Sequence, residues 1–220
     1  MTSTGWDRWS PLSGVLSVAC FIVAILVYGN GPKNDDEKIV AYFAKHSHQV
    51  QYFVGFFFLF ASLLLLLVFL ASLRGRLALA EGEPGRLTAL AFAGGVASTV
   101  LLMASNVFLA APAVTVNDTS KFKLDPNTYR LISDTGYGLF ISGVMAAIAL
   151  VATTSVLALR TRVFPRWFAW LGFPAALTFV VAFAFIPVFI LFGWVLVASA
   201  LMLFWAPRAE RAARPVPALG

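Results

Sequence analysis

Charged residues are scarce in this chain. They make up 12% of its 220 residues, whereas hydrophobic residues make up 60%. A water-soluble domain carries about 25% charged residues and cannot bury so much apolar surface. The mean hydropathy of +0.86 and the 21 Phe therefore predict an all-α, polytopic membrane protein whose helices face lipid on the outside and one another on the inside.

The middle of every apolar stretch lacks Asp, Glu, Lys, Arg and His. Proton relays, voltage sensors and retinal Schiff bases all need such groups within the membrane, so their absence argues against these functions. Motifs of soluble enzymes are also absent: the chain has no H-E-x-x-H, G-x-S-x-G, G-x-x-x-x-G-K or G-x-G-x-x-G. We therefore predict a protein that is not an enzyme and has no catalytic residues and no cofactor.

Cysteine and histidine are nearly missing as well. Cys20 is the only cysteine, which excludes an intramolecular disulfide, a Cys-rich zinc site and a CxxC redox pair. His46 and His48 are the only histidines. On the outer helix predicted below they would lie about 200° apart, so they cannot chelate one ion from it. The sequence predicts no metal site.

What the chain does contain is a series of apolar runs that each match the length of a membrane-spanning helix, about 20 residues. The six predicted spans are 12–29, 50–73, 87–111, 137–159, 165–183 and 187–205. Together they form a single six-helix domain over residues 1–206, and residues 207–220 are expected to form a disordered cytoplasmic tail.

Two helix boundaries are predicted from proline. The apolar stretch between Phe164 and Trp205 is too long for one span, so the chain is expected to double back between Phe183 and Pro187, with Pro187 at a first helical position. Asp125–Pro126 is typical of a helix cap followed by Pro. The fourth helix should therefore begin well outside the membrane.

The distribution of cations predicts the orientation, because cytoplasmic loops carry an excess of Lys and Arg. With both termini inside, ten cations are cytoplasmic: Arg8, Arg74, Arg76, Arg86, Arg160, Arg162, Arg166, Arg208, Arg211 and Arg214. Six lie outside: Lys33, Lys38, Lys45, Lys121, Lys123 and Arg130. All five tyrosines then map to the outer interface: Tyr28, Tyr42, Tyr52, Tyr129 and Tyr137. The basic net charge of +6 thus indicates topology and contact with membrane lipid, and gives no reason to predict nucleic-acid binding.

A short helix is predicted at the outer interface between the first two spans. Asn34 is placed to cap it, and acidic residues in its first turn suit the positive end of the helix dipole. Apolar residues recur at helical spacing on one face: Ile39, Val40, Phe43 and Val50. The two histidines fall on the same predicted helix.

A few polar side chains cluster near the outer ends of the predicted spans. If these helices pack together, an outward-facing polar pocket would be lined by Asp134, Tyr137, Asn106, Tyr52 and His48. The alternative is an Arg130–Asp134 surface pair together with an interhelical hydrogen bond of Asn106. Small residues on helix faces, such as Gly94 and Ser98, or Gly138 and Ser142, predict close helix packing.

The order of Trp9 to Gly14, Pro32, the acidic cap, Tyr42–Phe43 and His46 resembles uncharacterised multi-span membrane proteins of actinobacteria and related bacteria. The resemblance covers about the first half of the chain. It implies a multi-pass protein of the bacterial plasma membrane, and transfers no activity and no catalytic residue.

Three functions remain open from the sequence. The first is a non-enzymatic protein that binds or assembles with an envelope partner, or with copies of itself, through the outer helix, in particular through Ile39 and Phe43. The second is a small transporter or channel for an apolar or weakly polar solute. The third is a membrane enzyme that uses the outer polar residues Asp134 and His48.

Overall fold

The computed structural model describes residues 9–29, 31–32, 35–118 and 124–204, and these form an all-α bundle without strands. In chain order the elements are α2 (Leu12–Tyr28), α3 (Asp36–Phe43), α4 (His46–Glu81), α5 (Arg86–Asp118), α6 (Pro126–Thr161), α7 (Arg166–Thr178), the 3₁₀ helix η1 (Phe179–Ala184) and α8 (Ile186–Phe204). The predicted fold class, an all-α bundle of apolar membrane helices with a short additional helix, is confirmed.

The described part of the chain has five helices that are long and apolar enough to cross a membrane: α4, α5, α6, α7 together with η1, and α8. The first predicted span corresponds to α2, which is apolar but has 17 residues. At 1.5 Å per residue it is about 26 Å long, at the lower limit for a hydrocarbon layer of about 30 Å. The count of six spans stays a prediction.

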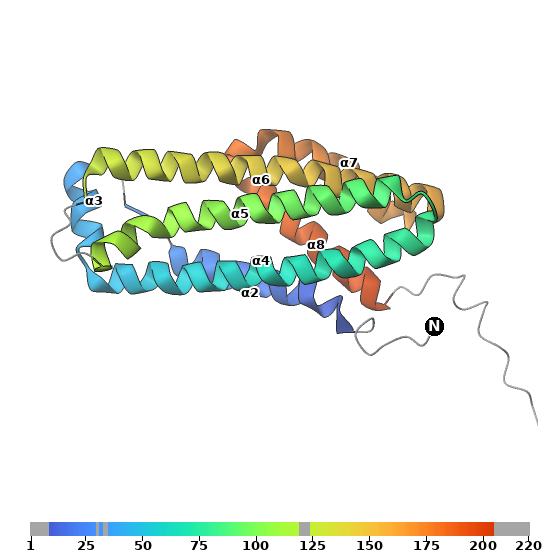
Figure 1. Ribbon diagram of the computed structural model, residues 1–220, viewed down its shortest axis with the longest axis horizontal. Helices are drawn as coiled ribbons and strands as arrows, with labels where there is room; N and C mark the ends of the chain where they lie inside the picture. The colour runs from blue at the N-terminus through green and yellow to red at the C-terminus, as the bar shows by residue number, and fades with distance from the viewer. Residues whose placement is uncertain (1–8, 30, 33–34, 119–123, 205–220) are drawn as a thin grey trace, which may run out of the picture.

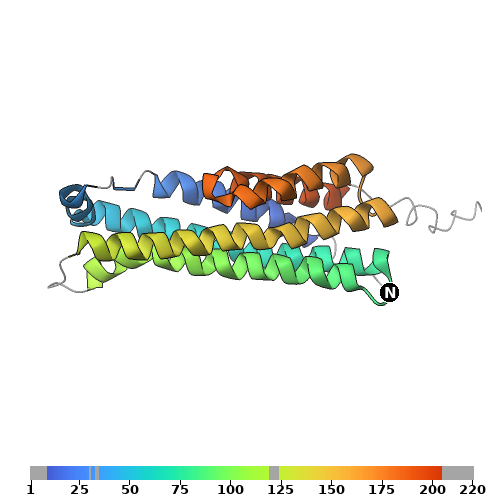
Figure 2. The same cartoon turned by 90° about the horizontal axis from the view of Figure 1, so that it is seen from above.

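The long helices run side by side along the major axis of the molecule, and α3 lies across one end of them (Figure 1). Viewed from above, α7 and α8 lie with α2 on one side of α4, α5 and α6 (Figure 2). The most extensive helix pairs are α5 with α6 and α2 with α4. We refer to the two ends of the bundle as the α3 end and the arginine end, because the described arginines other than Arg130 lie toward the second, either near the end of α4 or in or beside the turns there.

The predicted turn between the last two spans is present. After α7, the chain passes through η1 and reverses at Phe185, whose φ of 61° is left-handed. Helix α8 begins at Ile186, so Pro187 is its second residue and not its first. The missing N–H of proline still falls in the first turn, where no intrahelical bond would form.

The long helices are capped by carboxylates at both ends of the bundle. Asp125 accepts a hydrogen bond from the Thr128 N–H at 2.8 Å, and α6 begins at Pro126 as predicted. At the arginine end, the Glu81 carboxylate accepts hydrogen bonds from the backbone N–H groups of Leu87 (2.9 Å) and Thr88 (2.7 Å) in the first turn of α5. These bonds satisfy N–H groups that a helix start leaves without partners.

Within the bundle the helices approach closely at small residues. A Cβ added to Gly94 of α5 would lie 2.6 Å from the Ala149 Cβ of α6. Ser17 of α2 and Ser62 of α4 are fully buried and donate to each other's carbonyl oxygens at 2.8 and 2.7 Å. Gly138 is different: it is exposed, and a Cβ added there meets nothing within 4 Å, so it is not part of a packed face.

Several sequence-based predictions fall outside the described residues. They are the tail at 207–220, the Asn34 cap, and the positions of Arg8, Lys33, Lys121, Lys123, Arg208, Arg211 and Arg214.

Candidate functional site

The α3 end carries the densest group of polar and aromatic side chains that the structure describes, and it is built on the start of α3. The helix is capped by Asp35, one residue after the predicted cap, so Asp35 is not in the first turn. Its carboxylate accepts from the backbone N–H groups of Glu37 (3.1 Å) and Lys38 (3.4 Å). The Lys38 ammonium lies 3.0 Å from the same carboxylate. The hydrogen bond from the Lys38 side chain and those from the backbone N–H groups lower the pKa of Asp35, which is therefore ionised at neutral pH.

The end of α3 is fixed by the first turn of α4. Gln49 donates its side-chain N–H to the Phe43 carbonyl at 2.7 Å, and His48 Nδ1 lies 2.9 Å from the Tyr42 carbonyl. Both carbonyls belong to the last turn of α3, where regular helix bonds end, and the Tyr42 carbonyl also accepts from the backbone N–H of Lys45 at 3.3 Å. The predicted outer helix was therefore too long: it ends at Phe43, and His46, His48 and Val50 belong to α4.

One face of α3 is sealed against the bundle. Ile39 and Phe43 are fully buried, and they form a small core with Tyr52 of α4, Ala113 of α5 and Leu124. This corrects the prediction that Ile39 and Phe43 form a contact surface for a partner, because neither side chain is accessible. Val40 and Ala41 of α3 are exposed.

Four of the five tyrosines meet around this core. The Tyr52 ring makes edge contacts with the rings of Tyr28, Phe43 and Tyr42, with centroids 5.3, 5.3 and 6.2 Å apart. Tyr129 of α6 contacts Phe43 at 5.4 Å. Burial raises the pKa of the Tyr42 phenol, so it remains neutral at physiological pH. We call α3, these tyrosines, Ala113 and Leu124 the α3 cap.

Three of the five predicted pocket residues lie in or beside the α3 cap, and none lines an open cavity there. Tyr52 is in the aromatic group, and His48 stacks on the Tyr42 ring at 3.8 Å. Asn106 is fully buried. It accepts from the Tyr28 hydroxyl at 2.7 Å and donates to the Phe56 carbonyl at 3.1 Å. The predicted interhelical hydrogen bond of Asn106 is thus confirmed, with partners on α2 and α4.

The structure places the other two predicted residues elsewhere. The Tyr137 hydroxyl donates to the Phe183 carbonyl, beside the α7–α8 turn, and its ring stacks on Phe140. Asp134 is exposed on α6. The predicted Arg130–Asp134 pair was wrong, because Arg130 pairs with Asp36 of α3 instead. The pair between Asp36 and Arg130 ties α3 to the start of α6.

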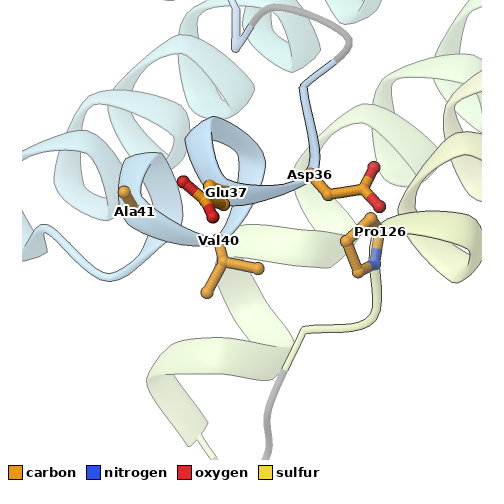
Figure 3. Close-up of a pocket in the computed structure, with 5 residues that line it drawn as sticks. All are labelled: Asp36, Glu37, Val40, Ala41 and Pro126. Atoms are coloured by element: carbon orange, nitrogen blue, oxygen red, sulfur yellow. The ribbon is translucent and has the colours of Figure 1, made fainter.

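The exposed side of the cap is hollowed where α3 meets the start of α6. An open depression of about 430 Å³ is lined by Asp36, Glu37, Val40 and Ala41 of α3 and by Pro126 of α6. The Asp36 side chain extends toward Pro126, and Val40 lies between the two helices (Figure 3). The depression thus has an apolar floor and two carboxylates at its rim. Sequence reasoning missed it, although the acidic turn of α3 and Asp125–Pro126 were both recognised.

The described residues contain no group of three or more His, Cys, Asp or Glu side chains that could hold a metal ion. His48, which the enzyme hypothesis requires near a carboxylate, is directed at the Tyr42 carbonyl instead. The arrangement of the cap provides recognition groups, namely carboxylates beside apolar surface, on a fixed helix.

Comparisons with protein-family models, with curated proteins and with solved structures give no match to this chain.

Proposed function

We propose that this chain is a multi-pass protein of a bacterial plasma membrane that binds a partner protein through the exposed face of the α3 cap. The observation that carries this proposal is the open depression between α3 and α6, two helices that the Asp36–Arg130 pair joins. The absence of catalytic motifs supports a binding role over an enzymatic one.

The cap is suited to binding because its helix is already ordered. Asp35 caps the start of α3, Gln49 and His48 satisfy its last carbonyls, and Ile39 and Phe43 are buried beneath it. A partner that docks on a pre-ordered helix does not have to order it, which improves affinity for the same contacts. A loop with the same side chains would lose part of the binding free energy to ordering.

The chemistry of the depression defines the partner. Asp36 and Glu37 place carboxylates beside Val40, Ala41 and Pro126. Arg130 neutralises part of the charge of Asp36, and Glu37 adds a second negative charge at the rim. The complementary ligand is a segment of another envelope protein that presents a Lys or Arg next to an apolar side chain.

The excess of arginine at one end of the bundle supports a cap that faces the outside of the cell. Six arginines lie toward the end opposite α3: Arg74 and Arg76 near the end of α4, and Arg86, Arg160, Arg162 and Arg166 in or beside the turns. Cytoplasmic loops carry this excess in plasma membranes. The partner is then an extracytoplasmic segment of a second protein.

The test is site-specific photo-crosslinking in native membranes. A benzophenone amino acid at Val40, in the depression, should give a discrete adduct that can be identified by mass spectrometry. The same probe at Leu131, which is 69% exposed on the same end of α6 but outside the depression, should not. The adduct should be lost on adding Glu37→Lys, because the charge that attracts the partner is reversed.

The matched control is Asp134→Lys, which makes the same charge change at an exposed carboxylate of the same end of the bundle. It should leave the Val40 adduct intact. Identical adducts from Val40 and Leu131, or equal losses with Glu37→Lys and Asp134→Lys, would show that the depression is not the binding surface.

A further inference from the structure

A second hollow lies between α4 and α5, apart from the depression of the cap. It is an apolar groove of about 290 Å³ with Phe53, Phe56 and Phe57 of α4 on one side and Val107, Ala111 and Val114 of α5 on the other. Both helices belong to the set that can cross a membrane. Phe57 is 65% exposed, Val107 51% and Val114 43%. The groove therefore opens sideways, onto the surface that meets lipid.

The groove lies toward the outer ends of two predicted spans. Its α5 side runs from Val107 to Thr115, which is about 12 Å at 1.5 Å per residue. One leaflet contributes roughly 15 Å of a hydrocarbon layer of about 30 Å. The groove residues lie in the half of α4 and α5 nearer the cap. The predicted spans end at residue 111 on α5 and begin at residue 50 on α4, so the groove lies at the outer edge of the leaflet at the α3 end.

The two helices that form the groove are joined next to it by a buried hydrogen bond of Asn106. Asn106 precedes the wall residue Val107 in the sequence and donates to the carbonyl of Phe56, a residue of the opposite wall, at 3.1 Å. The Tyr28 hydroxyl fixes the orientation of the amide from α2. Buried amide bonds of this kind position helices at a defined spacing. The rings of Phe56 and Phe57 on the α4 wall make an edge contact with each other, with centroids 5.4 Å apart.

The walls present no free polar group to an occupant. The hydroxyl of Thr115 donates to the Ala111 carbonyl at 2.9 Å within the same helix. The remaining lining side chains are hydrocarbon. An occupant needs no hydrogen-bonding group of its own and gains by contact with rings and methyl groups.

We propose that this groove binds one hydrocarbon chain of a bilayer lipid from the leaflet at the α3 end. A helix of a partner, or of a second copy, is about 10–12 Å across and normally packs along several turns. The α4 side of the groove covers only Phe53 to Phe57, little more than one turn. A single acyl or isoprenoid chain fits the narrow space that remains. The inference is independent of the function proposed for the cap.

The experiment uses the full chain in vesicles of phosphatidylglycerol and phosphatidylethanolamine that contain a phospholipid with a diazirine on its acyl chain. After irradiation, adducts are mapped by mass spectrometry. Residues 53–57 and 107–115 should carry about five times more adduct than the lipid-facing positions Leu64 and Val100, a ratio equivalent to roughly 1 kcal/mol of preference. Leu64 and Val100 are 48% and 52% exposed on the same two helices.

Ala111→Phe fills the groove with a ring and should reduce its labelling to the level at Leu64, whereas Val100→Phe adds the same ring outside the groove and should not. If Ala111→Phe fails to fold, Ala111→Leu provides the smaller filling, and monodisperse elution in detergent identifies the folded variants. Uniform labelling of all lipid-facing positions would overturn the proposal. So would crosslinks between two protein chains at Phe57 in place of lipid adducts.

Discussion

The α3 cap and the membrane-spanning part of the bundle both bury aromatic rings, but they differ in how their helices are brought together. In the cap, large rings meet around Phe43 and Tyr52, and the short helix is fastened by side-chain hydrogen bonds at both ends. The bundle also buries large rings, such as Phe21 stacked on Phe192 at 3.9 Å, but its helix backbones approach most closely at small residues, with Gly94 against Ala149 and Ser17 against Ser62.

The difference follows from the surroundings of each region. At the interface with water, burying an aromatic ring is favourable because it removes apolar surface from water. Between helices in lipid this driving force is absent, because lipid chains are as apolar as leucine. Helices there gain from van der Waals contact and interhelical hydrogen bonds, both of which require close backbones. Phe43 thus stabilises helix packing at the interface with water, and Gly94 stabilises it within the lipid.

The largest effect should come from Phe43→Ala, which empties the core of the cap. Replacing a buried Phe by Ala costs about 3–5 kcal/mol. Because α3 has eight residues and is docked by this core, the loss should appear as release of α3 while the bundle stays folded. Hydrogen exchange of residues 36–43 should become fast, with residues 87–111 unchanged.

The control is Val40→Ala, on the exposed face of the same helix, which should leave the exchange of α3 as it is. Equal exchange in both variants, or general unfolding of the bundle with Phe43→Ala, would contradict the separation of the two regions.

Gly94→Ala tests the bundle in the same manner and should have the next largest effect. The added methyl group would lie 2.6 Å from the Ala149 Cβ and 3.0 Å from the backbone nitrogen of Leu150, so α5 and α6 must separate. Overpacking of this kind costs roughly 1–3 kcal/mol, which thermal unfolding in detergent would show as a lower midpoint.

Gly193→Ala makes the same chemical change in α8, where the new Cβ meets nothing within 4 Å. It should be neutral or stabilise by about 0.5–1 kcal/mol, since Ala is the better helix former. Two equal midpoints would show that close contact at Gly94 is not required.

The smallest effect is a pH dependence confined to the cap. The pKa of Asp35 is lowered in the folded protein, so its contribution is present above the ordinary aspartate pKa of about 3.9 and is lost as the pH falls through the lower folded value. Below about pH 4, hydrogen exchange of residues 36–43, corrected for the intrinsic rate, should therefore rise. Asp35→Asn still caps the helix but does not titrate, and should remove this dependence. The same pH profile in both proteins would show that another group is responsible.

Helix positions followed closely from the sequence. Each of the six predicted apolar runs corresponds to a helix within the described residues, the reversal falls at Phe185 within the predicted turn, and Asp125–Pro126 starts α6. Errors were largest at α3, where periodicity carried the predicted helix past Phe43. At the break, the side chains of Gln49 and His48 reach back to the last carbonyls of α3. Hydrophobic periodicity does not detect contacts of this kind.

The candidate site was predicted less well. Polar residues near the outer helix ends were recognised, but their grouping was not: Asn106 bonds to Tyr28 and Phe56, whereas Tyr137 turns toward Phe183. The role of Tyr28 could have been suspected, because a tyrosine at the end of an apolar helix needs a partner for its hydroxyl. Nothing in the sequence indicated which residue that partner would be.

The sequence by itself determined which segments are helices suited to a membrane, because the cost of placing charges and unpaired backbone groups in hydrocarbon is a local property of each segment. The tertiary structure alone decided what those helices present to one another and to the outside. Asp36 and Arg130 are 94 residues apart, and Tyr28 and Asn106 are 78 apart. Such pairs form only when each helix has a particular rotation about its axis and a particular position along it. Both are set by all the packing contacts together, so the local sequence pattern does not predict them.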